Sequence, residues 1–218
     1  MKCRICKKEI EKGTICPECV YRERWEREKL EIMDSLFPLR IIEDITELSI
    51  EVAQEDIDAV INTKKGLFIY GKTGTGKTIY AASLLLAVIK KYKLEDHSTI
   101  TGQYIGGSEF FQEIRDTFSI PSATSSDVLQ KYEDADLLVF DEIGTEKPSD
   151  WVLQMLYLLI NYRYEHRKPI IIVSNFGLKE LRKRLQDDRI PSRITGMCKI
   201  KHFEGSDFRI KGEQNVYK

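Results

Sequence analysis

The octapeptide GKTGTGKT, residues 71–78, lies between two apolar runs, GLFIY and IYAASLLLAVIKK. It matches the pattern G-x-x-x-x-G-K-[ST] at its four specified positions, Gly71, Gly76, Lys77 and Thr78. Glycines let the backbone curl so that several N–H groups point into one concavity, and the start of a helix there favours an anion. We therefore predict that this stretch is a phosphate-binding loop between a buried strand and a helix.

The loop predicts the contacts of a bound nucleoside triphosphate. The Lys77 ammonium is expected to reach the β- and γ-phosphates, and the Thr78 hydroxyl to hold Mg²⁺. The nucleotide-contacting set comprises Gly71, Lys72, Thr73, Gly74, Thr75, Gly76, Lys77 and Thr78. The alternative is a glycine-rich turn with an incidental lysine, but the flanking strand and helix patterns favour nucleotide binding.

A second stretch, LLVFDEIG, supplies two adjacent carboxylates. Its apolar residues predict a strand that ends at Asp141, where the carboxylate can support the Mg²⁺ ion. Glu142 follows and is predicted to orient or deprotonate an attacking water as the catalytic base. Two carboxylates at the end of a buried strand are costly unless a cation or a polar cleft receives them.

The strand IIIV is followed by Ser174 and Asn175, whose polar side chains could hydrogen-bond the γ-phosphate or the attacking water. We assign Asn175 a catalytic role on this basis. The segment DEIG also fits the D-x-x-G pattern of GTPases, but those proteins carry an N-K-x-D motif that reads guanine. The sequence contains no N-K-x-D, so ATP is the predicted nucleotide.

Four of the five cysteines form two C-x-x-C pairs near the N-terminus, Cys3, Cys6, Cys16 and Cys19. Four thiolates satisfy tetrahedral Zn²⁺, and disulfides are unusual in a reducing cytosol. We predict a structural zinc site, with iron–sulfur ligation as the alternative. Cys198 lies far away in the sequence and is expected to be a buried, inert thiol.

The chain has 218 residues and a formal charge of −1, which argues against binding polyanions through overall charge. No apolar run is long enough to span a bilayer, and the N-terminus lacks a signal-peptide core, so we expect a cytoplasmic protein without membrane contact. We divide the chain into a zinc segment (1–20), a linker helix (21–38) and an ATPase domain (39–218).

Strands and helices alternate within the ATPase domain, which predicts an α/β fold with a parallel sheet flanked by helices. Strands are expected at GLFIY, STITGQYI, DLLVFDEIG, PIIIVSNF and CKIKHF. Ser108 is expected to cap the helix that contains EFFQEIRDTF. No helical lid domain is expected after the last strand.

These motifs, in this order, resemble the AAA+ ATPases, and among them the DnaC/IstB-like group that includes replicative-helicase loaders. GKTGTGKT, LLVFDEIG and VSNF resemble the Walker A, Walker B and sensor 1 motifs of that group. DRIPSRI resembles its box VII, which implies that Arg193 is an arginine finger. Arg189 is the competing candidate, although we expect Pro191 to break helical spacing between the two arginines. EGSDFRIK resembles the closing segment and implies a sensor 2-like role for Arg209.

The resemblance implies an ATP-dependent DNA replication factor that loads a hexameric replicative helicase, with hydrolysis as a release switch. It implies that the helicase binds residues 1–38, that neighbouring subunits associate through the ATP site, and that residues 101–126 face single-stranded DNA. Stacking candidates there are Tyr104, Phe110, Phe111 and Phe118, with Lys90, Lys91 and Lys93 nearby. The helical spacing of EFFQEI also suits core packing. Two alternatives stay open: transposition target selection in the IstB manner, and a non-hydrolysing zinc and nucleotide adaptor.

Overall fold

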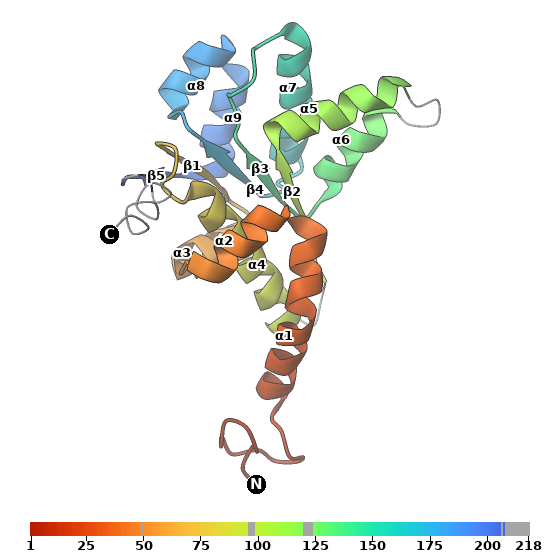
Figure 1. Cartoon of the computed structure of the whole chain (residues 1–218), viewed down its shortest axis with the longest axis vertical. Helices are drawn as coiled ribbons and strands as arrows, with labels where there is room; N and C mark the ends of the chain where they lie inside the picture. Colours follow the sequence, from red (N-terminus) through yellow and green to blue (C-terminus); the bar gives the residue numbers. More distant parts are fainter. Residues whose placement is uncertain (49, 96–98, 120–123, 206, 208–218) are drawn as a thin grey trace, which may run out of the picture.

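Five parallel strands form a single sheet in the computed structural model, which describes residues 1–48, 50–95, 99–119, 124–205 and 207 (Figure 1). The strand order is β2-β3-β4-β1-β5, and each neighbouring pair runs parallel. The strands are β1 (Gly66–Gly71), β2 (Gly102–Gly106), β3 (Leu137–Asp141), β4 (Ile170–Ser174) and β5 (Cys198–Phe203). The predicted α/β class and all five predicted strands are confirmed.

Helices cover both faces of the sheet (Figure 1). One face packs against α1 (Pro17–Leu36), α2 (Leu39–Leu48), α3 (Gln54–Thr63) and α4 (Lys77–Glu95). The other packs against α5 (Gly107–Asp116), α6 (Ser125–Asp134), α7 (Asp150–Glu165), α8 (Leu178–Leu185) and α9 (Arg189–Met197), with a short 3₁₀ turn, η1 (Thr117–Ser119), after α5. Among the described helices, none combines the length and the apolar character of a membrane span.

The central strands are apolar at successive positions because both of their faces are covered. In β3, Leu137 and Val139 contribute to the core beside α4, whereas Leu138 and Phe140 contribute to the core beside α7. The residues of β4 divide between the two cores in the same way. Because β4 pairs in parallel with both β1 and β3, the carboxyl ends of the three strands lie at the same edge of the sheet. Ligands bind at that edge of an open parallel sheet whose faces are covered by helices.

Helix α1 begins at Pro17, earlier than the boundary expected at residue 21, because proline suits the first helical position. Its N-terminal end projects from the body of the molecule, and its other end reaches the sheet (Figure 1). Trp25 and Met33 are buried in the core beside α4, and Glu28 pairs with Lys93 of α4 at 2.6 Å. The linker helix therefore packs against the ATPase core along much of its length.

The start of α4 is anchored by a buried carboxylate of α3. Asp56 is 1% exposed, accepts a hydrogen bond from the Tyr80 hydroxyl at 2.6 Å and pairs with Lys201 of β5. Because Tyr80 comes just after the phosphate loop, this network joins the loop's helix to α3 and β5.

Two local predictions were wrong. Helix α5 begins at Gly107 with Gly106 as its N-cap, so Ser108 lies in the first turn, and its hydroxyl donates to Glu146 instead of capping the helix. Helix α9 runs through Pro191 without a break, because proline in the first turn lacks only an N–H that has no partner within the helix.

Candidate nucleotide-binding site and cysteine cluster

The loop after β1 has the backbone conformation that its glycines predict. Gly74 and Gly76 have φ angles of 77° and 85°, values that favour glycine. A side chain at Gly71 would overlap the backbone of Phe203, and one at Gly74 would overlap the Asp207 carboxylate. Glycine at positions 71 and 74 therefore lets the loop curl closely against its neighbours.

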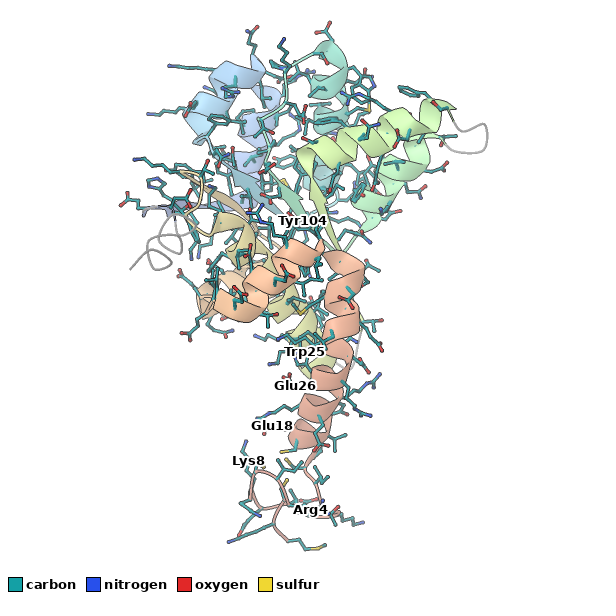
Figure 2. All side chains as sticks on the ribbon, viewed as in Figure 1. Arg4, Lys8, Glu18, Trp25, Glu26 and Tyr104 are labelled. Atoms are coloured by element: carbon teal, nitrogen blue, oxygen red, sulfur yellow. The ribbon has the colours of Figure 1, made fainter. Side chains whose placement is uncertain are left out.

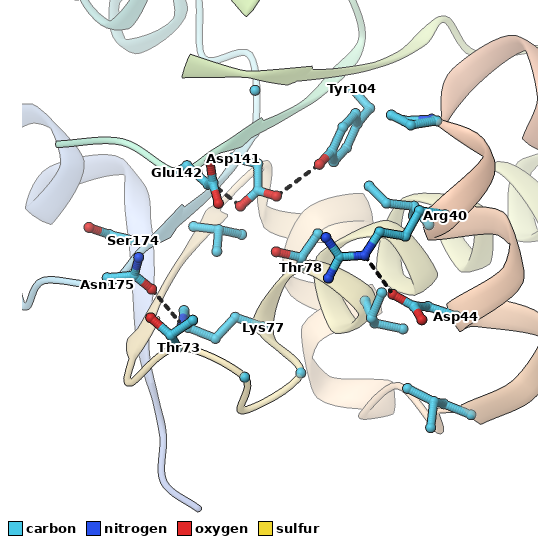
Figure 3. Close-up of a pocket in the computed structure, with 18 of the residues that line it drawn as sticks. Arg40, Asp44, Thr73, Lys77, Thr78, Tyr104, Asp141, Glu142, Ser174 and Asn175 are labelled. Atoms are coloured by element: carbon cyan, nitrogen blue, oxygen red, sulfur yellow. Dashed lines mark hydrogen bonds and ion pairs between the residues drawn. The ribbon is translucent and has the colours of Figure 1, made fainter. Parts of the chain in front are cut away.

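Lys77 lies at the first position of α4 and is 5% exposed. Its ammonium donates to the Lys72 carbonyl oxygen at 2.7 Å. It also donates to Asn175 Oδ1 at 3.0 Å (Figure 3). The loop lysine and the polar residue after β4 therefore meet, although they are far apart in the sequence. The catalytic roles of Lys77 and Asn175 stay predictions.

Ser174, the other polar residue at the end of β4, is used within the chain. Its hydroxyl donates to the Ile143 carbonyl oxygen at 2.9 Å and accepts from the Phe176 N–H at 3.1 Å. These bonds fix the segment after Asp141 against the end of β4, so Ser174 has a structural role in the arrangement described.

Asp141 ends β3 with a side chain that faces the loop, and the residue is 4% exposed. Its carboxylate accepts a hydrogen bond from the Tyr104 hydroxyl at 2.8 Å (Figure 3), and Thr78 lines the same pocket. Burial raises the pKa of Asp141, and hydrogen bonding by Tyr104 and Thr78 opposes the rise. A buried carboxylate beside a threonine hydroxyl is a donor set that suits Mg²⁺, a hard cation that prefers oxygen ligands.

Glu142 points away from the core, and its side chain is exposed. Its φ of 61° is unusual for a residue with a side chain, and such strained conformations cluster at functional sites. The Glu142 N–H donates to Asp141 Oδ1 at 2.9 Å, which supports the turn. Glu142 lines the same pocket as Lys77. A catalytic base must lie in the nucleotide pocket, so this position is compatible with the predicted role.

The pocket has a volume of about 690 Å³, within the usual range for a small-molecule or cofactor site. The phosphate loop, Asp141, Glu142 and Asn175 form one wall, and α2 forms another (Figure 3). Its size and its ammonium, hydroxyl and carboxylate groups fit a nucleoside triphosphate with Mg²⁺.

Sequence reasoning missed the part of the pocket that α2 contributes, including Arg40 and Asp44. No motif marks these residues, because α2 precedes the loop and reaches it only through packing. Tyr104, one of the DNA-stacking candidates, is used within the chain: its hydroxyl donates to Asp141, and its ring packs edge-on against Phe37 with the ring centres 5.5 Å apart.

The two candidate finger arginines lie on α9, and neither lines the described pocket of its own chain. Arg193 donates from Nε to Asn161 at 2.6 Å and from Nη2 to the Tyr157 hydroxyl at 3.0 Å. Arg189 pairs with the buried Asp187 at 2.7 Å. Arg209, the sensor 2-like candidate, lies outside the described residues.

The DNA-stacking candidates separate by burial. Phe110 and Phe111 are core residues, 0% and 1% exposed, whereas Phe118 is 69% exposed and packs against Trp151. The lysines of α4 are engaged elsewhere, on the face of the sheet that carries α1 and α3: Lys90 lies over the Trp25 ring, Lys91 pairs with Asp58, and Lys93 pairs with Glu28.

The four N-terminal cysteines gather at the start of α1, and their sulfur atoms all lie within 4.8 Å of one another. A hydrogen bond from the Cys16 N–H is the main cause that lowers the pKa of Cys3 to about 6, whereas burial and the neighbouring thiols raise that of Cys19 to about 12. A bound cation would offset the repulsion between four thiolates held this close together. Lys8 pairs with Glu18 of α1 beside the cluster (Figure 2). The donor set fits a tetrahedral zinc ion.

We expect purified protein to contain about one zinc ion per chain, as a four-thiolate site requires. Cys16→Ser combined with Cys19→Ser should remove the metal, and hydrogen exchange of residues 1–20 should rise while the ATPase core stays protected, because the core packs independently of the cluster. Elemental analysis measures the metal and also distinguishes zinc from iron. Cys198→Ala is the matched control, since Cys198 is buried outside the cluster. Less than half an equivalent of either metal would contradict the assignment.

The strand order, the loop after β1 and the carboxylates after β3 define a P-loop nucleotide-binding protein of the AAA+ class. The family described as the bacterial DnaA ATPase domain matches residues 37–200. The chain therefore belongs to the family of the bacterial DnaA ATPase domain.

Helicase loaders are among its relatives, as the sequence motifs predicted. The chain is 29% identical over 119 residues to the replicative helicase loader DnaI of Bacillus subtilis, an alignment that covers 54% of this chain and 35% of DnaI. The crystal structure of the DnaC helicase loader has the same fold, with a TM-score of 0.59 at 22% identity, and the match covers 72% of this chain and 94% of DnaC.

The AMPPCP-bound DnaA of Aquifex aeolicus also shares the fold, with a TM-score of 0.57 at 23% identity, over 77% of this chain and 52% of DnaA. The chain spans less than half the length of the first curated relatives that it matches.

Proposed function

We propose that this protein is a cytoplasmic, ATP-dependent DNA replication factor that binds single-stranded DNA and loads a replicative hexameric helicase. The observation that carries the proposal is one pocket that joins the phosphate loop, Asp141, Glu142 and Asn175, within a chain related to a helicase loader and to replication initiators. ATP hydrolysis, with Glu142 as the base, would then release the helicase.

The cysteine cluster is suited to hold a partner because α1 presents it at a distance from the sheet (Figure 1). The same helix ends beside the pocket: Phe37, its C-cap residue, packs on Tyr104, and Tyr104 binds Asp141. We assign helicase binding to residues 1–38. The contacts from Asp141 through Tyr104 to Phe37 would then connect the nucleotide site to the helix that binds the partner.

Single-stranded DNA is assigned to the tip formed by the end of α5, η1 and the start of α7. Phe118 is exposed there, and the Arg115 guanidinium lies 4.9 Å from the centre of the Trp151 ring. Exposed aromatic rings beside a cation suit the stacking of unpaired bases. We assign self-association to the ATP site and α9, because Arg189 and Arg193 lie outside the described pocket of their own chain and would act on the nucleotide of a neighbouring chain.

A loading assay tests the proposal. Full-length protein, a purified hexameric replicative helicase and ATP should give helicase activity on single-stranded DNA coated with its binding protein, where the helicase alone has little. The Cys16→Ser, Cys19→Ser double variant should lose the effect but keep ATP binding, because the cluster lies far from the pocket. Stimulation of a transposase in place of the helicase would favour the IstB-like alternative, and the absence of hydrolysis would favour the adaptor.

A further inference from the structure

The charges that line the nucleotide pocket do not by themselves suit a polyanion. The described lining residues include two cations, Lys77 and Arg40, against five carboxylates, Asp44, Glu47, Glu109, Asp141 and Glu142. A Mg²⁺ ion would offset the carboxylates nearest to Thr78, but those on α2 face the same space. A second cation beside Lys77 would therefore favour the binding of a triphosphate in this pocket.

Arg40 lies in the first turn of α2, just after Pro38. Ile41 and Ile45 of the same helix are buried in the core beside α4, so α2 is held firmly against the helix that follows the phosphate loop. The Arg40 guanidinium extends into the pocket and, in the view of Figure 3, lies between Thr78 and Asp44, whereas Lys77 lies on the other side of Thr78.

The contact that holds Arg40 is weak. Its Nε lies 3.9 Å from Asp44 Oδ2, one helical turn away, and the Arg40 side chain is 66% exposed. Exposed ion pairs of this kind contribute little to the free energy of folding. Arg40 can therefore leave Asp44 and pair with another anion at little cost in free energy. A guanidinium presents a planar fork of donors that matches phosphate oxygens better than it matches a carboxylate at this distance.

We propose that Arg40 is a phosphate-binding residue of the nucleotide site, contacting the phosphate chain in cis from the side of Thr78 opposite to Lys77. Phosphate oxygens would replace Asp44 as the anionic partner of Arg40. The inference rests on the proposed function, because it deepens the nucleotide site on which that function depends.

Titration of ATP into Arg40→Ala tests the proposal. The affinity should fall on the order of tenfold to a hundredfold, as expected for the loss of a charged hydrogen bond. Arg40→Lys should recover part of the loss, because the charge is kept and the fork is lost. Asp44→Asn should strengthen binding, since the competing anion is gone. Inorganic tripolyphosphate, which has no base, should compete less well in Arg40→Ala than in the wild type.

Arg22→Ala is the matched control: Arg22 is 60% exposed, pairs with Glu18 one turn away and lies on α1 outside the pocket. Its ATP affinity should equal that of the wild type. Wild-type affinity in Arg40→Ala, together with loss of binding in Lys77→Ala, would overturn this inference alone. A loss for ATP without any loss for tripolyphosphate would place Arg40 at the base and would also overturn it. If the wild type binds no ATP, the proposed function fails instead.

Discussion

Lys77→Ala is expected to lower the affinity for ATP by at least about a hundredfold, because the ammonium is expected to donate several charged hydrogen bonds to the phosphates. Lys77 is 5% exposed and projects into a pocket that carries five carboxylates and, apart from Lys77, one cation among its described lining residues. The remaining groups cannot compensate for its loss. Isothermal titration calorimetry with ATP and Mg²⁺ measures the effect.

Lys65→Ala is the control for this variant, because Lys65 is exposed just before β1 and lies outside the described lining of the pocket. Lys65→Ala should therefore bind ATP with an affinity close to that of the wild type. Wild-type affinity in Lys77→Ala would contradict the assignment of the loop.

Glu142→Gln is expected to bind ATP normally and to hydrolyse it about a hundredfold to ten-thousandfold more slowly, the range of effect of a general base. The variant removes the proton acceptor but leaves the Glu142 N–H, which donates to Asp141. Single-turnover hydrolysis measures the difference. Glu146→Gln, a change in the same loop outside the described lining of the pocket, is the control. Equal turnover in Glu142→Gln and wild type would move the base elsewhere.

The same variant tests whether Arg193 acts on a neighbouring subunit. Arg193→Ala and Glu142→Gln proteins should each be inactive, but their mixture should recover part of the turnover, because an intact arginine from one chain can meet an intact Glu142 in the other. Activity should also rise more than linearly with protein concentration, and single-stranded DNA should raise it further. Strictly linear activity without recovery on mixing would remove Arg193 from the site.

Much of the fold could be predicted from local patterns, because the order of apolar, polar and glycine residues within a segment limits the structure that the segment can adopt. The run LLVFD is buried at every position of β3, and GKTGTGKT has the curled backbone that its glycines allow. The limits of individual helices were less predictable. Pro191 and Ser108 each lie in the first turn of a helix. Proline breaks a helix in its interior but not in its first turn, and serine caps a helix only at the residue before that turn. A shift of one or two residues in the helix boundary therefore reverses both predictions.

Short stretches of sequence were enough to identify the phosphate loop, the carboxylates at the end of β3 and the four-cysteine set, because the residues of each lie close together in the chain. The groups that surround these motifs could be identified only from the folded chain. Folding brought Asn175 to Lys77, directed the Tyr104 hydroxyl to Asp141, and placed Arg40 in the pocket wall. These contacts join segments that meet only when helices pack on both faces of the sheet. Burial of apolar surface drives that packing, and because it is non-directional, a local sequence pattern does not reveal which polar groups will meet.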